Sequence, residues 1–314
     1  MLSSLILCVS ACNGPNGDGD SAGPRGLTGT EPPRWAASLG PIATLTTPNA
    51  GLLHSHSTVD WDGGDRYLVT WAAGTEPNTI VLAARCDHDG TVLDEPKELS
   101  VPGGVGDKPD VEWDGARWVI GWNDNQGRVL LNAIAPDGTV AGDPVVIHDV
   151  DIDADAVDLA VRPGGGSAIW TEFGAEWMGE FGGRIVWKDF GADLAPSTIP
   201  KLADLSSRKT ADAASTADGG WVGVWSRDID DPLVDGDFVY EVWGRLYRGD
   251  GTLWTFRADD LDSAWPSRPA VDVADDGTIA VSWRDKTESE GAGLGSGAYL
   301  RLFAPDATPL GPSL

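Results

Sequence analysis

The sequence predicts an all-β fold built from five similar four-stranded antiparallel units. Apolar segments that end in tryptophan recur about every 50 residues, a period typical of propeller blades and solenoid turns. The chain of 314 residues contains 41 Gly and 21 Pro, which indicates many turns and argues against a helical bundle. Five such units closed into a ring form a five-bladed β-propeller. The periodic tryptophans are Trp71, Trp122, Trp170, Trp225 and Trp283.

The second unit shows the strand pattern most clearly, and we label the four strands of a unit A to D in chain order. Its strands are predicted at residues 109–113, 117–122, 128–135 and 142–147, separated by turn residues. An Asp-Gly-Thr turn stands between strands C and D at Asp137, and it recurs at Asp89 and Asp250 and as Asp306-Ala307-Thr308. Asp-Gly suits the positive φ of tight hairpins. A linear β-solenoid is the alternative, but its rungs are usually shorter and lack such hairpins.

The B strands are apolar at nearly every position, which is expected for strands covered on both faces by neighbouring blades. The fifth unit ends at residues 308–314, where its strand D should run. Residues 39–47 precede the first strand A and have the character of a strand D. We therefore predict that this N-terminal strand pairs into the fifth blade and closes the ring.

The N-terminus has the pattern of an export signal. Residues 2–9 are apolar but too few to span a bilayer, and Val9-Ser10-Ala11-Cys12 resembles a bacterial lipobox, which implies lipidation of Cys12. We assign residues 1–12 to this signal, 13–33 to a flexible Gly/Pro/Asp tether and 34–314 to the propeller. The expected location is the bacterial cell envelope, lipid-anchored, on the periplasmic side or the cell surface. Cys86 would then have no partner for an internal disulfide.

The charge of the chain excludes some classes of partner. Asp and Glu total 49 against 22 Lys and Arg, for a net charge of −27. A field of this sign repels nucleic-acid phosphates and anionic lipid surfaces. We therefore expect no nucleic-acid partner and membrane contact only through the lipid anchor. We also expect a monomer.

Two units resemble a repeat that is common in secreted bacterial proteins. The matching segments are GDRYLVTWAA with VLAARCDHDGTVLDE, and GARWVIGWND with AIAPDGTV. The resemblance covers about residues 39–314 and is weakest in the third unit, where Gly191-Ala192-Asp193-Leu194 replaces the turn motif. It implies a propeller outside the cytoplasm and brings no activity or site residues.

The B–C and D–A loops vary in length, so a functional site is expected on their side of the scaffold. Each strand A carries one carboxylate, and together these side chains would form a ring around the central channel. The ring would bind Ca²⁺ or a cationic ligand, or would contain an acid/base pair, as in certain five-bladed glycosidases whose catalytic carboxylates come from inner strands. Alternatively, each acid bonds the backbone of its own blade or a strand C arginine such as Arg85, Arg245 or Arg301. The ring residues are Asp60, Glu112, Asp158, Asp212 and Asp272.

Two further sets of residues lie in the variable loops. Phe173, Trp177 and Phe181 stand among glycines, where they would form a stacking platform for a sugar or an anchor for a protein, or would cap the edge of the propeller. The second set is acidic and is explained either by solubilising surface charge or by Ca²⁺ binding, the one cofactor that we consider. Its members are Asp151, Asp153, Asp155, Asp228, Asp230, Asp235 and Asp237.

These patterns favour a non-catalytic module that binds or scaffolds a glycan or protein through the B–C/D–A face. A polysaccharide-cleaving glycosidase that uses inner-strand carboxylates is the alternative, and a Ca²⁺-stabilised structural lipoprotein is a third hypothesis. The surroundings of the five strand A acids separate these hypotheses. Catalysis needs two carboxyl groups in unlike environments, whereas five equivalent acids indicate a structural or ion-binding ring.

Overall fold

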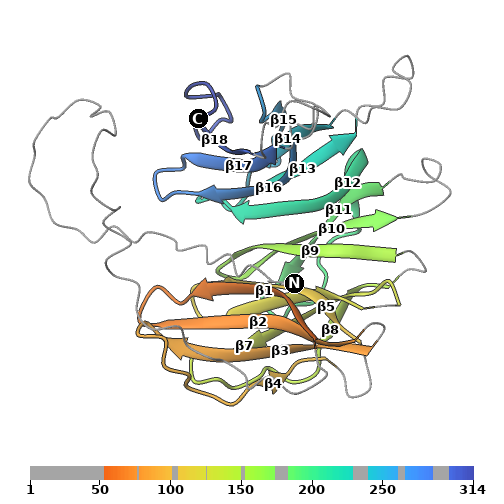
Figure 1. The fold of residues 1–314 in the computed structure, drawn as a ribbon, viewed down its shortest axis with the longest axis vertical. Coiled ribbons are helices and arrows are strands. Elements are labelled where there is room, and N and C mark those ends of the chain that lie inside the picture. The colour runs from red at the N-terminus through yellow and green to blue at the C-terminus, as the bar shows by residue number, and fades with distance from the viewer. Residues whose placement is uncertain are drawn as a thin grey trace, which may run out of the picture. The chain divides into compact units, whose positions relative to one another are not determined.

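The computed structural model confirms the all-β fold (Figure 1). It describes residues 53–75, 78–100, 105–124, 126–149, 153–173, 183–228, 240–260, 266–285 and 297–314. The predicted signal with Cys12, the tether at 13–33 and the closing strand at 39–47 lie outside these residues. Within the described ranges, no helix is long and apolar enough to cross a membrane.

Blades 1, 2 and 5 form separate antiparallel sheets with the chain-order pairing that the turns predict. Blade 1 contains β1 (Leu53–Trp61), β2 (Arg66–Thr75), β3 (Asn78–Asp87) and β4 (Lys97–Glu98). Blade 2 contains β5 (Asp107–Trp113), β6 (Trp118–Asn123), β7 (Val129–Ile134) and β8 (Val145–His148). Blade 5 contains β16 (Pro266–Val273), β17 (Ile279–Asp285) and β18 (Gly297–Phe303).

Blades 3 and 4 are fused into one sheet by a long shared strand, β12 (Lys201–Ser215). The first part of β12 pairs with β11 as strand D of blade 3, and its last five residues pair with β13 as strand A of blade 4. Blade 3 otherwise contains β9 (Asp153–Arg162), β10 (Gly165–Phe173) and β11 (Gly183–Gly191). Blade 4 continues with β13 (Trp221–Asp228), β14 (Tyr240–Tyr247) and β15 (Leu253–Arg257). The five units of the sequence are therefore five blades.

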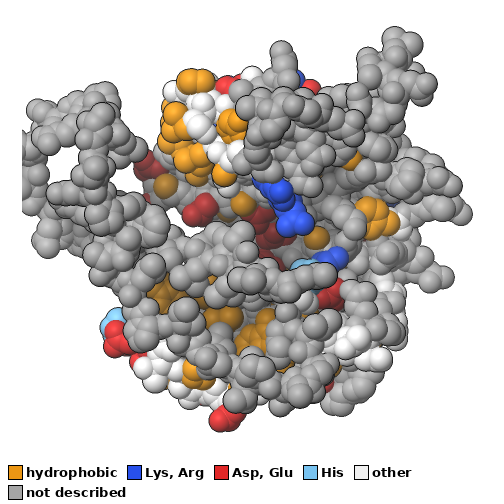
Figure 2. Space-filling model, in the orientation of Figure 1, with side chains coloured by type: hydrophobic (Ala, Val, Ile, Leu, Met, Phe, Trp, Pro, Cys, Tyr) orange, Lys and Arg blue, Asp and Glu red, His pale blue; other side chains and the backbone are white. Residues whose placement is uncertain are grey.

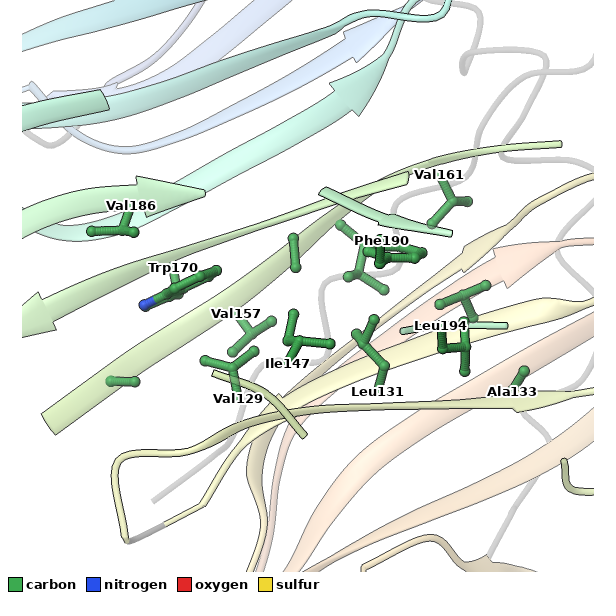
Figure 3. Packing of buried hydrophobic residues seen from close by; sticks show 14 residues of the cluster. Val129, Leu131, Ala133, Ile147, Val157, Val161, Trp170, Val186, Phe190 and Leu194 are labelled. Carbon is green, nitrogen blue, oxygen red and sulfur yellow. The ribbon is translucent and has the colours of Figure 1, made fainter. Parts of the chain in front are cut away.

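Four of the five periodic tryptophans pack between blades, whereas the cluster of Trp71 contains described residues of blade 1 alone. Trp170 on β10 lies with Val129 of β7 and Val157 of β9 in a cluster that joins blades 2 and 3 (Figure 3). Trp122, Trp225 and Trp283 join the other consecutive blades in the same way. Every residue of β6 and β7 is buried, as predicted for strands covered on both faces. The period in the sequence is thus the period of inter-blade packing.

The Asp-Gly-Thr turns have the expected local chemistry. Asp137 Oδ1 accepts the backbone N–H of Thr139 at 2.9 Å, and Gly138 has a φ of +86°. These turns also join neighbouring blades, because the Pro136 carbonyl accepts hydrogen bonds from Arg66 Nη1 at 2.8 Å and from Arg85 Nη1. Carbonyls at the same turn position accept from Arg117 and Arg248 at the 2–3 and 4–5 junctions. The turn motif therefore serves blade assembly.

Replacing Gly138 by alanine is expected to lower the free energy of unfolding by about 2 kcal/mol, because an L-residue is strained at this φ. The added Cβ would also lie 2.9 Å from Nε and Nη2 of Arg85 and disturb its bond to blade 2. Urea unfolding measures the change. Gly311→Ala is the control, since a Cβ there meets no heavy atom within 4 Å. Equal midpoints for the two variants would contradict the expectation.

The last residues of the chain lie along the outer edge of β18. Leu310 N donates to Leu302 O at 2.9 Å, and Leu314 N donates to Leu300 O at 2.9 Å. Residues 309–314 thus occupy part of the strand D position of blade 5, beyond the bridge between Phe303 and Pro309. Closure of the ring by residues 39–47 stays a prediction.

Candidate functional site

Strand A of each blade lies on the inner side, and consecutive A strands are neighbours from β1 to β5, β9, β12 and β16. Each strand A starts at the end of the blade where the D–A connection arrives. Residues near its start therefore lie closest to the B–C and D–A loops. Figure 2 shows Asp and Glu side chains in a hollow near the middle of the view, with Lys or Arg side chains beside them.

Backbone register places the inner-strand acids in two tiers. The outer tier lies nearer the B–C and D–A loops. Its members are the strand A residues that pair with the residue just before the periodic tryptophan of strand B. It consists of Thr58, Asp110, Asp158, Asp212 and Ala270. The inner tier lies two residues farther along strand A. It consists of Asp60, Glu112, Ala160, Ala214 and Asp272.

The predicted single ring of five acids is therefore wrong. Asp158 and Asp212 belong to the outer tier, whereas Asp60, Glu112 and Asp272 belong to the inner tier. The Val-Asp motifs look alike in sequence, but the A–B turns differ in length, so similar motifs lie at different heights. Each strand A also contains a register shift that precedes the outer tier. Each tier therefore contains three acids instead of five. Those of the outer tier come from blades 2, 3 and 4, and those of the inner tier come from blades 1, 2 and 5.

Asp110 is a member of the cluster that the sequence analysis missed. It lies two residues before Glu112 on β5, so both side chains point to the same face of the strand. The alternation Asp-Val-Glu was the available signal. Blade 2 is the only one of the five to supply an acid to both tiers.

The outer tier is a hydrogen-bonded row of carboxyl groups. Asp158 bonds to both Asp110 and Asp212 through its side chain. Two carboxyl groups can bond each other only if one holds a proton, so this row shares protons. Burial, the largest cause, and the charges of Asp212 and Asp110 raise the pKa of Asp158 well above its usual value.

Burial and the charge of Asp212 raise the pKa of Asp110 from its ordinary value of 3.8 to about 7. Three hydrogen bonds oppose this rise: one from Asp158, one from the backbone N–H of Val111, and one from the backbone N–H of Leu159 to Asp110 Oδ2 at 2.9 Å. Asp212 is held similarly, since its Oδ2 accepts the N–H of Val271 at 2.5 Å. Both Asp110 and Asp212 thus have donors that favour their ionised form.

Glu112, in the inner tier, has surroundings that favour its protonated form instead. Burial is the largest cause that raises the pKa of Glu112 well above its ordinary 4.5, and the charges of Asp110, Asp60, Asp212 and Asp272 raise it further. Burial and these charges therefore favour the protonated form. The side chain remains half-buried rather than sealed, so part of it meets solvent.

Asp60 is intermediate, because burial raises its pKa while backbone N–H groups of Trp61 and Trp113 lower it. Its Oδ2 accepts the Trp113 N–H of blade 2 at 2.5 Å. Asp272 is exposed and its Oδ1 accepts the N–H of Val273 at 2.8 Å. The inner tier thus contains both a half-buried acid, Glu112, and an exposed one, Asp272.

The alternative in which each acid bonds within its own blade is only partly right. Asp60, Asp110 and Asp212 accept backbone N–H groups from strand A of the next blade, so they join blades. The arginines named for that alternative have other partners. Arg85 bonds Asp94, Arg245 bonds Thr255, and Arg301 bonds the Gly311 and Ala258 carbonyls.

Four of the A strands have a residue with left-handed backbone just before the outer tier. His56, Lys108, Ala156 and Arg268 each lie two residues before the outer tier and have φ between 47° and 53°. His56 Nδ1 lies 3.1 Å from Asp107 Oδ1. Blades 1, 2 and 5 therefore each carry a basic residue near the loop end of strand A.

The other predicted site residues are not brought to this cluster by the described structure. Phe173 ends β10, while Trp177 and Phe181 lie outside the described residues. Asp153 and Asp155 lie on β9 and Asp228 ends β13, but their side chains are not described. Asp151, Asp230, Asp235 and Asp237 lie outside the described ranges. In the described part of the chain, no group of three or more His, Cys, Asp or Glu side chains is arranged to hold a metal ion.

Comparisons with known proteins show the fold. No protein-family model matches the sequence, and no curated protein matches it. An α-L-arabinanase of Penicillium chrysogenum, solved with arabinobiose, matches with a TM-score of 0.52 at 14% identity over 86% of this chain and 84% of that one. An endo-arabinase of Bacteroides thetaiotaomicron matches with a TM-score of 0.45 at 14% identity, over 79% and 90% of the two chains. The chain thus has the five-bladed propeller fold of such glycosidases.

Proposed function

We propose that this protein is a glycoside hydrolase that cleaves a polysaccharide at the two carboxyl tiers. The carrying observation is that Asp110 and Glu112, neighbours on one face of β5, have unlike environments. Asp110 receives hydrogen bonds that favour its carboxylate, whereas burial and the charges of the surrounding tier acids favour the protonated form of Glu112. Pairs of carboxyl groups whose pKa values are set by different surroundings are the acid and base of many hydrolases.

The backbone spacing suits this role. Residues two apart on a strand are about 6–7 Å apart, and the carboxyl groups of glycosidases are about 5–9.5 Å apart. The directly bonded acids of the outer tier are too close to flank a glycosidic bond with a water molecule. The acid and base therefore come from different tiers, and Asp158 positions Asp110 through its hydrogen bond.

In this mechanism Glu112 donates its proton to the glycosidic oxygen as the bond from that oxygen to the anomeric carbon breaks. Asp110 accepts a proton from the water that forms the new bond to that carbon. The spacing lies near the lower end of the range for inverting enzymes, so inversion at the anomeric carbon is expected. A non-catalytic binding role would not require the unlike environments of these two groups.

The test is hydrolysis of soluble arabinan, arabinoxylan, levan and β-glucan, followed as the release of reducing ends. We expect the wild type to cleave one of these polymers and Asp110→Asn to be about 10²–10⁴-fold slower, as for loss of a general base. Glu98→Gln, an exposed amide substitution on β4, is the matched control and should keep full activity. Equal rates for Asp110→Asn and wild type would contradict the proposal.

A further inference from the structure

Trp254 is an exposed aromatic residue that the repeat does not require. It lies on β15, the edge strand of blade 4, and 57% of its surface is exposed. The residue before it, Leu253, pairs with Tyr247 of β14, and the other four blades contain a corresponding pair. The residue that follows each pair is therefore equivalent to Trp254. Those positions hold Leu93, Ala141, Ser197 and Leu310. Blade 4 alone places a large flat ring there.

A cavity of about 320 Å³ lies beside this ring, between the C–D turns of blades 4 and 5. Its size is within the range of about 300–1,000 Å³ of small-ligand pockets. Arg248 joins the two turns, since its Nη2 donates to Pro305 O at 2.9 Å. The cavity is lined by Arg248, Asp250, Thr252, Trp254, Asp306 and Thr308.

The polar groups around the ring are held in fixed positions. Asp250 Oδ1 accepts the Thr252 N–H at 2.8 Å, and Asp306 Oδ1 accepts the Thr308 N–H at 3.0 Å. The hydroxyls of Thr252 and Thr308 also bond these carboxylates. A carboxylate has about four acceptor positions, so each still has acceptor capacity beside the indole. Within the described part of the chain, Trp254 takes part in no hydrogen bond or ring contact, so its face and its N–H are open there.

We propose that Trp254 and the two turns form a second binding site, for a neutral sugar ring of a polysaccharide. A pyranose presents C–H groups on its faces, which pack on an aromatic ring, and hydroxyl donors at its rim, which suit carboxylate acceptors. Two carboxylates and the net charge of −27 disfavour an anionic ligand. The cavity suits one or two sugar units rather than a protein surface.

This site is independent of the proposed hydrolase site. The C–D turns stand at the opposite end of the blades from the loops nearest the outer tier. A polymer bound at Trp254 is therefore anchored without occupying the carboxyl tiers. The site would hold the protein on polysaccharide whether or not the inner strands are catalytic.

The experiment measures retention of the full chain in gels that contain soluble arabinoxylan, β-glucan or arabinan, and titration with cellohexaose and xylohexaose. The wild type is expected to be retarded by at least one polymer, and Trp254→Ala to lose at least about tenfold in affinity. Leu93→Ala, at the same position of blade 1 and 42% exposed, should bind as wild type does. Asp158→Asn should also keep this binding, which separates the site from hydrolysis.

Two results would overturn the inference. They are no retardation of the wild type by any of these polymers, and equal retardation of Trp254→Ala and wild type. Because Trp254 is exposed, the variant should fold, and an unchanged far-UV circular dichroism spectrum would verify this. Partial rescue by Trp254→Phe would support stacking as the source of affinity.

Discussion

Glu112→Gln is expected to lower kcat on a polysaccharide by about 10²–10⁴-fold, because glutamine cannot donate the proton that the leaving oxygen requires. The wild type should lose activity as pH rises through the raised pKa of Glu112, since only its protonated form donates. This fall in kcat at high pH, the alkaline limb of the profile, should be absent from the residual activity of Glu112→Gln. The measurement is kcat against pH.

Leaving-group dependence separates this role from a structural one. An aryl glycoside whose leaving group departs as an anion needs no proton, so Glu112→Gln should be much less impaired on it than on polysaccharide. Glu98→Gln is the control, because it alters an exposed carboxyl group outside the tiers. An equal loss on both substrates, or an intact alkaline limb, would exclude Glu112 as the general acid.

The carboxyl tiers should also make the folded state less stable as pH rises. Asp110 has a folded pKa of about 7 against an ordinary 3.8, so between these values the native state binds more protons than the unfolded state. Stability is then full below about pH 4 and falls as pH approaches and passes 7.

Asp110→Asn removes the titrating group, so its free energy of unfolding should fall less between pH 4.5 and 8 than that of the wild type. Urea unfolding at several pH values measures this. The range begins at pH 4.5 because hydrogen bonds from His148, Trp170 and Arg184 outweigh burial and lower the pKa of Glu172, and that contribution is lost in acid. Asp143→Asn, an exposed change, should follow the wild type. Parallel pH curves for wild type and Asp110→Asn would refute the expectation.

The strand order and the blade count were predictable because their signals are local. A buried strand covered on both faces must be apolar throughout, and Trp122 ends such a strand in β6. The turn at Gly138 needs positive φ, which Asp-Gly supplies at the lowest cost. The non-catalytic module favoured from sequence is less well supported than the hydrolase that we propose, since the two carboxyl tiers are asymmetric.

The carboxyl cluster was predictable as a set of residue types but not as an arrangement. One acid per strand A suggested equivalence, yet Asp158 and Glu112 lie in different tiers, and Asp110 joins them. Heights along neighbouring strands depend on bulges and turn lengths, and a shift of two residues leaves the alternation of faces unchanged. The sequence pattern therefore did not show which acids of different blades lie at the same height.

The sequence by itself determined the fold class, the repeat and the turns, because each depends on residues near one another in the chain. Only the tertiary structure decided which carboxyl groups share protons, which blade's N–H each accepts, and that Trp254 borders a cavity between two turns. These features depend on the register between blades. That register is set by packing around the buried tryptophans over separations of about 50 residues.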